Sequence, residues 1–278
     1  MIKTLLITLF ILATATSVHA ETYQAIQGDM VAIERALPDG SVTLRCFNKS
    51  WPVIRTEAGH VKGWIGVDLA TKPSAHLVKW SVSTPNSETI RFVDEVSVTK
   101  GEFRVSHITV EKKMAVFGKK ELKRIRADQK MLKDSYVASV DATPELQISG
   151  MPSDGIISTP FGAQRFVNGE PRSPHSGIDI AAPEGTPVMT PLGGRVLIVS
   201  AMYLNGNTVA IGHGYGAVSV FSHLKSAAVK EGDWIEAGSQ IGEVGMTGRA
   251  TGPHLHWGVR FNQARINPES MLSRKQSD

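Results

Sequence analysis

Alternating apolar and polar positions dominate the first part of the chain. Within 42–46, the apolar residues Val42, Leu44 and Cys46 occupy every second position, and this period of two is that of a strand with one buried face. Similar short runs, separated by turn residues, occur at 30–33, 64–69, 77–82 and 90–98. Residues 21–110 are therefore predicted to form a small N-terminal β-sandwich.

The pattern changes to that of a helix near residue 111. From 111 to about 135, residues recur at three- and four-residue spacing and strong helix formers predominate, although Gly118 weakens the pattern locally. The next stretch, 142–155, contains two prolines and two glycines and is typical of a linker. A helix and linker are therefore predicted for 111–155.

From residue 156 onward the chain is rich in glycine, with short apolar runs such as 195–199 and 208–211. Strands this short, joined by tight turns, favour an antiparallel sheet or a barrel-like sandwich. The predicted fold class is therefore mainly β. A C-terminal antiparallel β-sheet or barrel-sandwich domain at 156–278 is preceded by the small β-sandwich and the helical linker.

The first twenty residues have the features of a secretory signal peptide. Lys3 precedes an apolar run from Leu5 to about Ala15, and small residues end the segment at Ala20. The run is shorter than the roughly 20 residues that a membrane anchor needs. We therefore expect cleavage after Ala20, a periplasmic or secreted protein, and no stable membrane insertion once the signal is removed.

Composition and charge add three points to the predicted fold: the number of domains, the state of the cysteine and the absence of a nucleic-acid partner. A chain of 278 residues with 41% hydrophobic and 20% charged residues suggests about two soluble domains. Cys46 is the single cysteine, so no internal disulfide can form, and its strand pattern predicts a buried thiol. The net charge of +4 arises from a basic segment at 111–134, so no nucleic-acid partner is expected.

The chemically distinctive residues lie in three short motifs of the C-terminal part. They are His175 and Asp179 in HSGID, His223 in FSHL, and His254 and His256 in GPHLHW. Side chains at even spacing on a strand point to one face. We therefore expect 175–181 and 254–261 to be strands with polar chemistry on one side and apolar residues on the other.

This set of residues suits a catalytic zinc ion. Zinc is bound by imidazole nitrogen and carboxylate oxygen, and a catalytic site uses three protein ligands and an open fourth position. His175, Asp179 and one of the paired histidines would supply such a set. The remaining histidines are then candidates for proton transfer or for stabilising an oxyanion. His213 lies between two glycines, is predicted to serve a turn, and is left out of the site.

Three longer segments resemble one family, the lysostaphin-type zinc metallopeptidases, or LytM-domain murein hydrolases. They are FGAQRFVNGEPRSPHSGIDIAAPEGTPV, GNTVAIGHGYGAVSVFSHL and VGMTGRATGPHLHWGV, and the likeness extends over about 156–268. The resemblance implies three zinc ligands, His175, Asp179 and His256, and two catalytic histidines, His223 and His254.

The same resemblance implies an exported zinc endopeptidase that hydrolyses peptide cross-links of peptidoglycan. Residues 28–69 resemble the small β-domain that precedes the catalytic domain in many Gram-negative members. Because an N-terminal segment covers the zinc cleft in some relatives, intramolecular inhibition by the N-terminal domain is a further expectation. Arg165 and Asn168 are expected to help line the cleft. Phe221 replaces a tyrosine that is frequent in the family, and the lost hydroxyl could weaken substrate positioning.

Two other classes of function fit parts of the sequence. Some family members have lost zinc ligands and only activate murein amidases, so a non-enzymatic envelope regulator that binds peptidoglycan or activates an amidase is the alternative. All five motif positions are kept here, which favours an enzyme. The stretch 184–245 also resembles histidine phosphocarriers and lipoyl-type barrel sandwiches. The predicted signal peptide argues against a phosphocarrier, because its phosphate donors are cytosolic.

Overall fold

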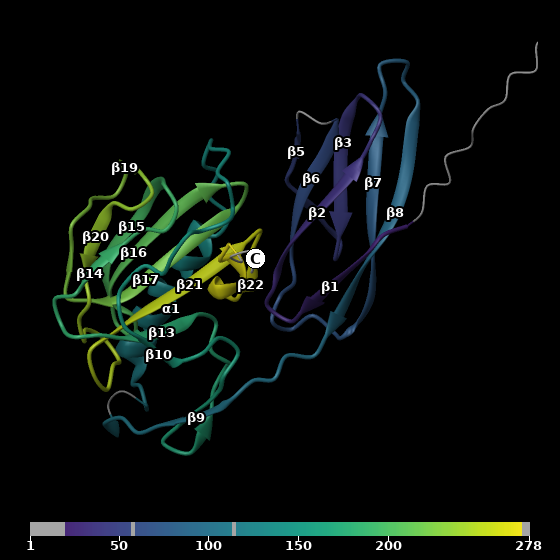
Figure 1. Ribbon diagram of the computed structural model, residues 1–278. Coiled ribbons are helices and arrows are strands. Elements are labelled where there is room, and N and C mark those ends of the chain that lie inside the picture. Colours follow the sequence, from purple (N-terminus) through teal and green to yellow (C-terminus); the bar gives the residue numbers. More distant parts are fainter. Residues whose placement is uncertain (1–19, 57–58, 113–114, 274–278) are drawn as a thin grey trace, which may run out of the picture.

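The N-terminal part of the chain is a sandwich of two β-sheets (Figure 1). The computed structural model describes residues 20–56, 59–112 and 115–273. Within these residues, one sheet has the order β1 (Thr22–Ile26), β8 (Thr89–Thr99), β7 (Ser74–Ser83), β3 (Ser41–Cys46) and β4 (Lys49–Trp51). The other has the order β2 (Met30–Ala36), β6 (His60–Gly66) and β5 (Val53–Arg55). Leu44, Val78 and Trp80 are fully buried, as the alternation of apolar residues predicts.

A larger sheet forms the centre of the C-terminal part. In the described residues its order is β10 (Ile156–Thr159), β13 (Ile178–Ala181), β21 (His254–Phe261), β17 (Ala217–Leu224), β16 (Gly206–Gly214), β15 (Gly194–Met202) and β19 (Trp234–Ile235). Two elements follow β21, namely β22 (Ala264–Ile266), which pairs with it, and the short 3₁₀ helix η2 (Pro268–Met271). A small sheet beside it has the order β14 (Pro187–Met189), β20 (Gln240–Glu243) and β18 (Ser226–Ala227).

This architecture confirms the prediction of a mainly β fold with antiparallel sheets. The central sheet is open rather than a closed barrel, because β10 and β19 end its path without pairing to each other in the described chain. The strand β21 spans 254–261 as predicted. Its apolar residues Leu255, Trp257 and Val259 are buried, so the periodicity of this segment identified both its extent and its core face.

The predicted helix is shorter than the sequence pattern suggests. The helix α1 spans Lys119–Ser135 and begins after Gly118, which has an extended backbone and no capping side chain. Glycine destabilises the interior of a helix. The helical pattern before Gly118 is therefore not continuous with α1. Ile125 is buried, and Asp128 accepts a hydrogen bond of 2.7 Å from the backbone N–H of Tyr203 on the C-terminal part. The helix therefore packs against the β15–β16 side of the central sheet.

A third small sheet joins the segment that follows the sandwich to the C-terminal part. Its order is β12 (Glu170–Pro171), β11 (Gln164–Val167) and β9 (Val105–Ile108). The strand β9 runs parallel to β11, with Arg165 opposite Ser106. Although β9 lies within the range predicted for the N-terminal domain, it leaves the sandwich and pairs with the C-terminal part (Figure 1).

Apolar and charged contacts connect the sandwich to the central sheet. The rings of Trp51 and Phe261 have centroids 5.2 Å apart, and both residues belong to one continuous core. Beside them, Asp68 binds Arg265 through hydrogen bonds of 2.6 Å and 3.1 Å from the guanidinium, and a third of 2.8 Å from the backbone N–H. The two parts are thus held together on the side of β22.

The Asp68–Arg265 pair is expected to make stability depend on pH. Burial acts to raise the pKa of Asp68, but hydrogen bonds from Arg265 outweigh it and lower this pKa to about 2. Because the folded-state pKa lies below the ordinary value near 3.9, the stabilisation is complete above about pH 4 and disappears as pH falls to about 2.

Asp68→Asn should therefore lower the free energy of unfolding by about 1–2 kcal/mol at pH 7, after allowance for partial exposure, and by much less at pH 2. Denaturant unfolding at both pH values, with Asp39→Asn as control, tests this; equal losses at both would contradict it.

Two further predictions concern the N-terminal region. Cys46 is buried as expected, and burial raises the pKa of its thiol to about 11 despite an opposing hydrogen bond from the Phe47 backbone, so an unreactive thiol is expected. The predicted signal peptide, 1–20, lies outside the described residues apart from Ala20. Among the described residues, no helix has both the length and the apolar character needed to cross a membrane.

Candidate metal centre and cleft

Two adjacent strands of the central sheet place an acid beside a histidine. In the antiparallel pair β13–β21, Asp179 lies directly opposite His256. Directly opposite residues on paired strands share one face of the sheet. The neighbouring positions in register, Ile178 and Trp257, are completely or almost completely buried. Strand pairing therefore directs the polar pair to one face while the apolar pair stabilises the other.

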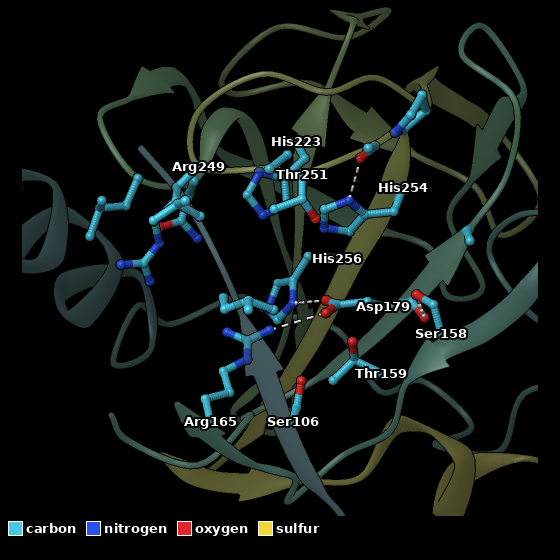
Figure 2. Close-up of a pocket in the computed structure, with 18 residues that line it drawn as sticks. Ser106, Ser158, Thr159, Arg165, Asp179, His223, Arg249, Thr251, His254 and His256 are labelled. Carbon is cyan, nitrogen blue, oxygen red and sulfur yellow. Dashed lines mark hydrogen bonds and ion pairs between the residues drawn. The ribbon is translucent and has the colours of Figure 1, made fainter. Parts of the chain in front are cut away.

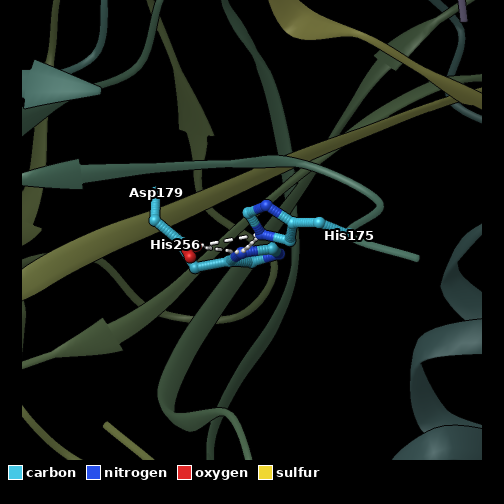
Figure 3. Close-up of side chains that lie close together, drawn as sticks. All are labelled: His175, Asp179 and His256. Carbon is cyan, nitrogen blue, oxygen red and sulfur yellow. Dashed lines mark hydrogen bonds and ion pairs between the residues drawn. The ribbon is translucent and has the colours of Figure 1, made fainter. Parts of the chain in front are cut away.

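His175 completes a compact triangle of potential ligand atoms (Figure 3). Its Nε2 lies 3.0 Å from Oδ1 of Asp179 and 2.9 Å from Nδ1 of His256, and the latter two atoms are 2.8 Å apart. The other ring nitrogen of His175, Nδ1, donates a hydrogen bond of 3.0 Å to the Pro160 carbonyl. Such a bond from the far nitrogen is the usual way to orient a metal-binding imidazole.

The position of His175 differs from the sequence prediction. The strand β13 begins at Ile178, so His175 precedes it and the expected common strand face does not apply. The chain instead passes close to β21 at Gly177, where an added Cβ would lie 2.4 Å from the Trp257 carbonyl and 2.9 Å from the His256 ring. The glycine of HSGID therefore allows His175 to approach its partners from a loop.

The chemistry of this triangle fits a divalent cation. Burial acts to raise the pKa of Asp179, but hydrogen bonds from His175 and His256 outweigh it and hold this pKa well below its ordinary value. Burial lowers the pKa of His256 to about 4, although Asp179 partly opposes this effect. Because Nδ1 of His175 already donates to the Pro160 carbonyl, its Nε2 can donate to Asp179 only when the ring carries two protons; in the neutral ring, the Nε2 lone pair faces the carboxylate with no proton between them. A cation bound by both atoms removes this repulsion, and two nitrogens and one oxygen are ligands that suit zinc.

An irregularity in β17 brings His223 to the same face. The preceding residues Phe221 and Ser222 lie opposite Trp257 and His256, so strict alternation would direct the next side chain into the core. The β16–β17 register shifts here, and His223 has a left-handed backbone with φ of 64°. Such a conformation costs a non-glycine residue about 1–2 kcal/mol. The bulge therefore turns His223 towards the face that carries Asp179 and His256.

His223 and His254 form a second pair, with ring centroids 4.7 Å apart. The Nδ1 of His223 donates to the Thr247 carbonyl over 2.8 Å, and the Nδ1 of His254 donates to the Gly252 carbonyl over 2.8 Å. Each ring therefore presents Nε2 as its second nitrogen. Burial, and then the charges of the neighbouring histidines, lower the pKa of His223 to about 3. His223 is consequently neutral at pH 7, with an Nε2 that carries no proton.

Both groups of residues open into one cleft of about 390 Å³ (Figure 2). Asp179, His223, His254 and His256 line it, whereas His175 lies behind them with 1% of its surface exposed. Arg165 donates a hydrogen bond of 3.1 Å to Oδ2 of Asp179 and lines the cleft as expected. Asn168, expected there too, is not among the lining residues, and its side chain bonds the Val110 backbone instead.

The comparisons with known proteins agree with this geometry. Residues 173–268 match the model of Peptidase family M23. This part of the chain is an M23 peptidase domain. The match includes each of the five motif residues, because it extends from just before HSGID to just after β22.

Relatives of known name are similar over less than half of this chain. The DD-carboxypeptidase/endopeptidase Mpg of Neisseria meningitidis is 40% identical over 115 residues, which are 41% of this chain and 26% of that protein. The peptidoglycan DD-endopeptidase ShyA of Vibrio cholerae is 44% identical over 112 residues, 40% of this chain and 26% of that protein. The matched part thus spans about a quarter of the length of these relatives.

One solved structure is similar over most of the chain. It is a crystal structure described as a candidate peptidase M23 from Pseudomonas aeruginosa, with 29% identity and a TM-score of 0.69. The alignment covers 88% of this chain and 94% of that one. The similarity therefore includes the region before the M23 domain as well as the domain itself.

Two residues of the M23 domain lie elsewhere than the sequence predicts. His213 belongs to β16 rather than to a turn, and its buried ring bonds the Gly193 carbonyl at 2.8 Å and the Ser219 hydroxyl at 2.9 Å. Phe221 is fully buried and stacks on Trp257 with centroids 6.3 Å apart. Phe221 does not line the cleft. The replacement of tyrosine by phenylalanine therefore changes the packing of the core, not the surface that would contact a substrate.

Sequence reasoning missed several residues of the cleft. Arg249 lies in the segment GRATGPHLHW, and its charge within a glycine-rich loop just before two site histidines was a signal that could have identified it. Ser106 and Ile108 of β9, and Val110 just beyond it, also line the cleft, but they carry no chemical signature. Their position follows from the parallel pairing of β9 with β11, which no local pattern specifies.

Proposed function

We propose that the chain is an exported zinc endopeptidase that hydrolyses peptide cross-links of peptidoglycan. The observation that carries this proposal is the triangle of His175, Asp179 and His256 beside a second histidine pair in one cleft of an M23 domain. Relatives named as peptidoglycan endopeptidases support the choice of substrate. Export and a periplasmic location rest on the predicted signal peptide at 1–20.

Each part of the site has a role in this reaction. Zinc held by His175, Asp179 and His256 would polarise the scissile carbonyl and activate water as a nucleophile. The free Nε2 of either His223 or His254 accepts the proton of the attacking water, and the other ring stabilises the oxyanion or protonates the leaving amine. Hydrogen bonds to the Thr247 and Gly252 carbonyls keep both rings directed for these transfers.

Digestion of purified sacculi tests the proposal. Zinc-loaded protein comprising residues 21–278 should release muropeptides and split cross-linked dimers, and a chelator should abolish both effects. Mass spectrometry of the products identifies the bond that is cut. If zinc-loaded protein, including a variant with an opened cleft, leaves sacculi and dimers intact, the chain is not such an enzyme. A non-enzymatic regulator that binds peptidoglycan or activates an amidase would then be favoured.

We also propose that the strand β9 inhibits the enzyme by covering part of the cleft. Its alternate residues Ser106 and Ile108, together with Val110 beyond it, line the cleft, while Val105 points outward with 60% of its surface exposed. Asn168 holds the end of this segment by accepting a hydrogen bond of 2.9 Å from the Val110 N–H and donating one of 3.0 Å to its carbonyl. In this proposal, the segment 105–110 narrows the cleft and so competes with a peptide substrate for space.

Asn168→Gly is expected to activate the enzyme. The variant loses both hydrogen bonds to Val110 but tolerates the left-handed backbone of this position, where φ is 51°. Weaker attachment of 105–110 should raise kcat/KM on a soluble cross-linked muropeptide by about 5- to 30-fold. Steady-state kinetics measures the gain.

Asn262→Gly is the matched control, because Asn262 also has a positive φ of 47° and its side chain bonds the Ser50 carbonyl, away from the cleft. Hydrogen exchange of 105–110 reports whether the segment is released. Faster exchange in Asn168→Gly without any gain in rate would show that β9 does not inhibit.

A further inference from the structure

One side of the cleft is positively charged. Arg165 and Arg249 both line it, and Asp179 is the only acid among the residues that the structure places around it. Because Asp179 belongs to the metal triangle, it does not neutralise these two arginines in addition to a metal ion. A cleft of this kind attracts anionic groups.

Arg249 has the unused donors on this side. Its backbone N–H donates to the Leu204 carbonyl over 2.8 Å, which fixes the loop. Its side chain is half-buried, and within the described residues its guanidinium has no hydrogen bond and no carboxylate partner. Arg165, in contrast, donates to Asp179. Among the charged groups of the cleft, Arg249 is therefore the one whose partner is missing.

The surroundings of Arg249 also disfavour its charge. Burial, followed by the positive charges of Arg165 and Arg172, lowers the pKa of the Arg249 guanidinium. The group nevertheless stays protonated at pH 7, because arginine titrates far above neutral pH. A half-buried cation close to two like charges gains more than an exposed one from binding an anion.

The loop that carries Arg249 also positions both site histidines. It connects β20 to β21, and it supplies the Thr247 carbonyl to His223 and the Gly252 carbonyl to His254. Gly248 packs against β16, where an added Cβ would lie 2.3 Å from the Gly206 nitrogen. An anion bound by Arg249 would therefore lie at a fixed position relative to the reacting groups.

We propose that Arg249, assisted by Arg165, binds a free carboxylate of the substrate, carried by a residue that flanks the scissile amide. This inference rests on the proposed function and specifies its substrate class as peptides with an acidic group beside the bond that is cut. Guanidinium and carboxylate can form two parallel hydrogen bonds, which would orient the peptide as well as attract it. A substrate in which this carboxylate is a carboxamide would leave Arg249 unpaired.

Two synthetic cross-linked peptides, identical except that this carboxylate is free in one and a carboxamide in the other, test the proposal. Wild-type enzyme should cut the acid with a kcat/KM about 10- to 100-fold higher than the amide, mainly through KM. Arg249→Gln should lose most of its rate on the acid, so that the ratio falls close to one, and Arg249→Lys should keep part of the preference. Arg195→Gln, a change at an exposed arginine on β15, should behave as wild type.

The proposal is overturned if Arg249→Gln retains the wild-type ratio of kcat/KM between the acid and the amide. It is also overturned if kcat/KM falls equally for both peptides while circular dichroism and zinc content are unchanged. Failure of the proposed function is a different result, namely that wild-type enzyme cuts neither peptide. Calorimetric binding of the two peptides decides the proposal in that case. The acid should bind more tightly than the amide to wild-type protein and equally to Arg249→Gln, and equal binding of both peptides to wild type would refute it.

Discussion

Replacement of His256 by alanine is expected to remove the metal and with it the activity. His256 is one of three potential ligands whose atoms lie 2.8–3.0 Å apart, and two remaining ligands hold zinc far more weakly than three. We expect kcat/KM on a cross-linked muropeptide to fall by about 10³-fold or more, which corresponds to about 4 kcal/mol of transition-state stabilisation. Zinc content, measured by mass spectrometry on the dialysed protein, should fall in parallel.

The fold should survive this change. The core side of β21 is formed by Leu255, Trp257 and Val259, and none of these residues is altered. His76→Ala is a suitable control, because His76 lies on β7 of the sandwich, away from the cleft. Zinc retained by His256→Ala at the wild-type stoichiometry and affinity would mean that the triangle is not the metal site.

Replacement of His223 is expected to reduce the rate while leaving the metal in place. His223 is not part of the triangle, but its ring centroid lies 6.3 Å from that of His256. Loss of a general acid or base costs about 10²- to 10⁴-fold in kcat. Asparagine suits the left-handed backbone here better than most residues, so His223→Asn should fold normally, bind one zinc ion and show this loss in steady-state kinetics.

A paired His254→Ala variant separates the roles of the two histidines. A substrate with a better leaving group, such as an ester in place of the amide, should restore much of the rate to the variant that lacks the general acid, but not to the one that lacks the general base. If His223→Asn keeps wild-type kcat on the amide, His223 has no part in the chemistry. If it instead loses zinc, its role is to support the metal site.

The sequence predicted best those features that depend on local periodicity. The alternation of histidines with apolar residues in 254–261 located β21 and its two faces, because burial on one side of a strand requires that pattern. The sandwich strands near Leu44 and Trp80 were identified for the same reason. The expected start of the helix at 111 was wrong, because Gly118 ends the helical stretch at its N-terminal side.

Features that depend on local irregularity or on distant pairing were not predictable in this way. His175 reaches the triangle from a loop, and His223 from a bulge with positive φ, so neither follows the strand alternation that places His256. The position of Ser106 depends on pairing between β9 and β11, which are more than fifty residues apart in sequence. The five candidate residues were nevertheless named from the sequence, because the spacing of the motifs resembles a known family, and the structure brings them together beside one cleft.

The strand β9 also limits how far the two parts of the molecule can separate. Only the short segment between Thr99, at the end of β8, and Val105, at the start of β9, links the sandwich to the paired strand. Fully extended, this tether spans about 20 Å. Any larger displacement of the sandwich must pull β9 away from β11. The proposed inhibition by β9 would therefore respond to the mechanical position of the N-terminal part through a single short stretch of backbone.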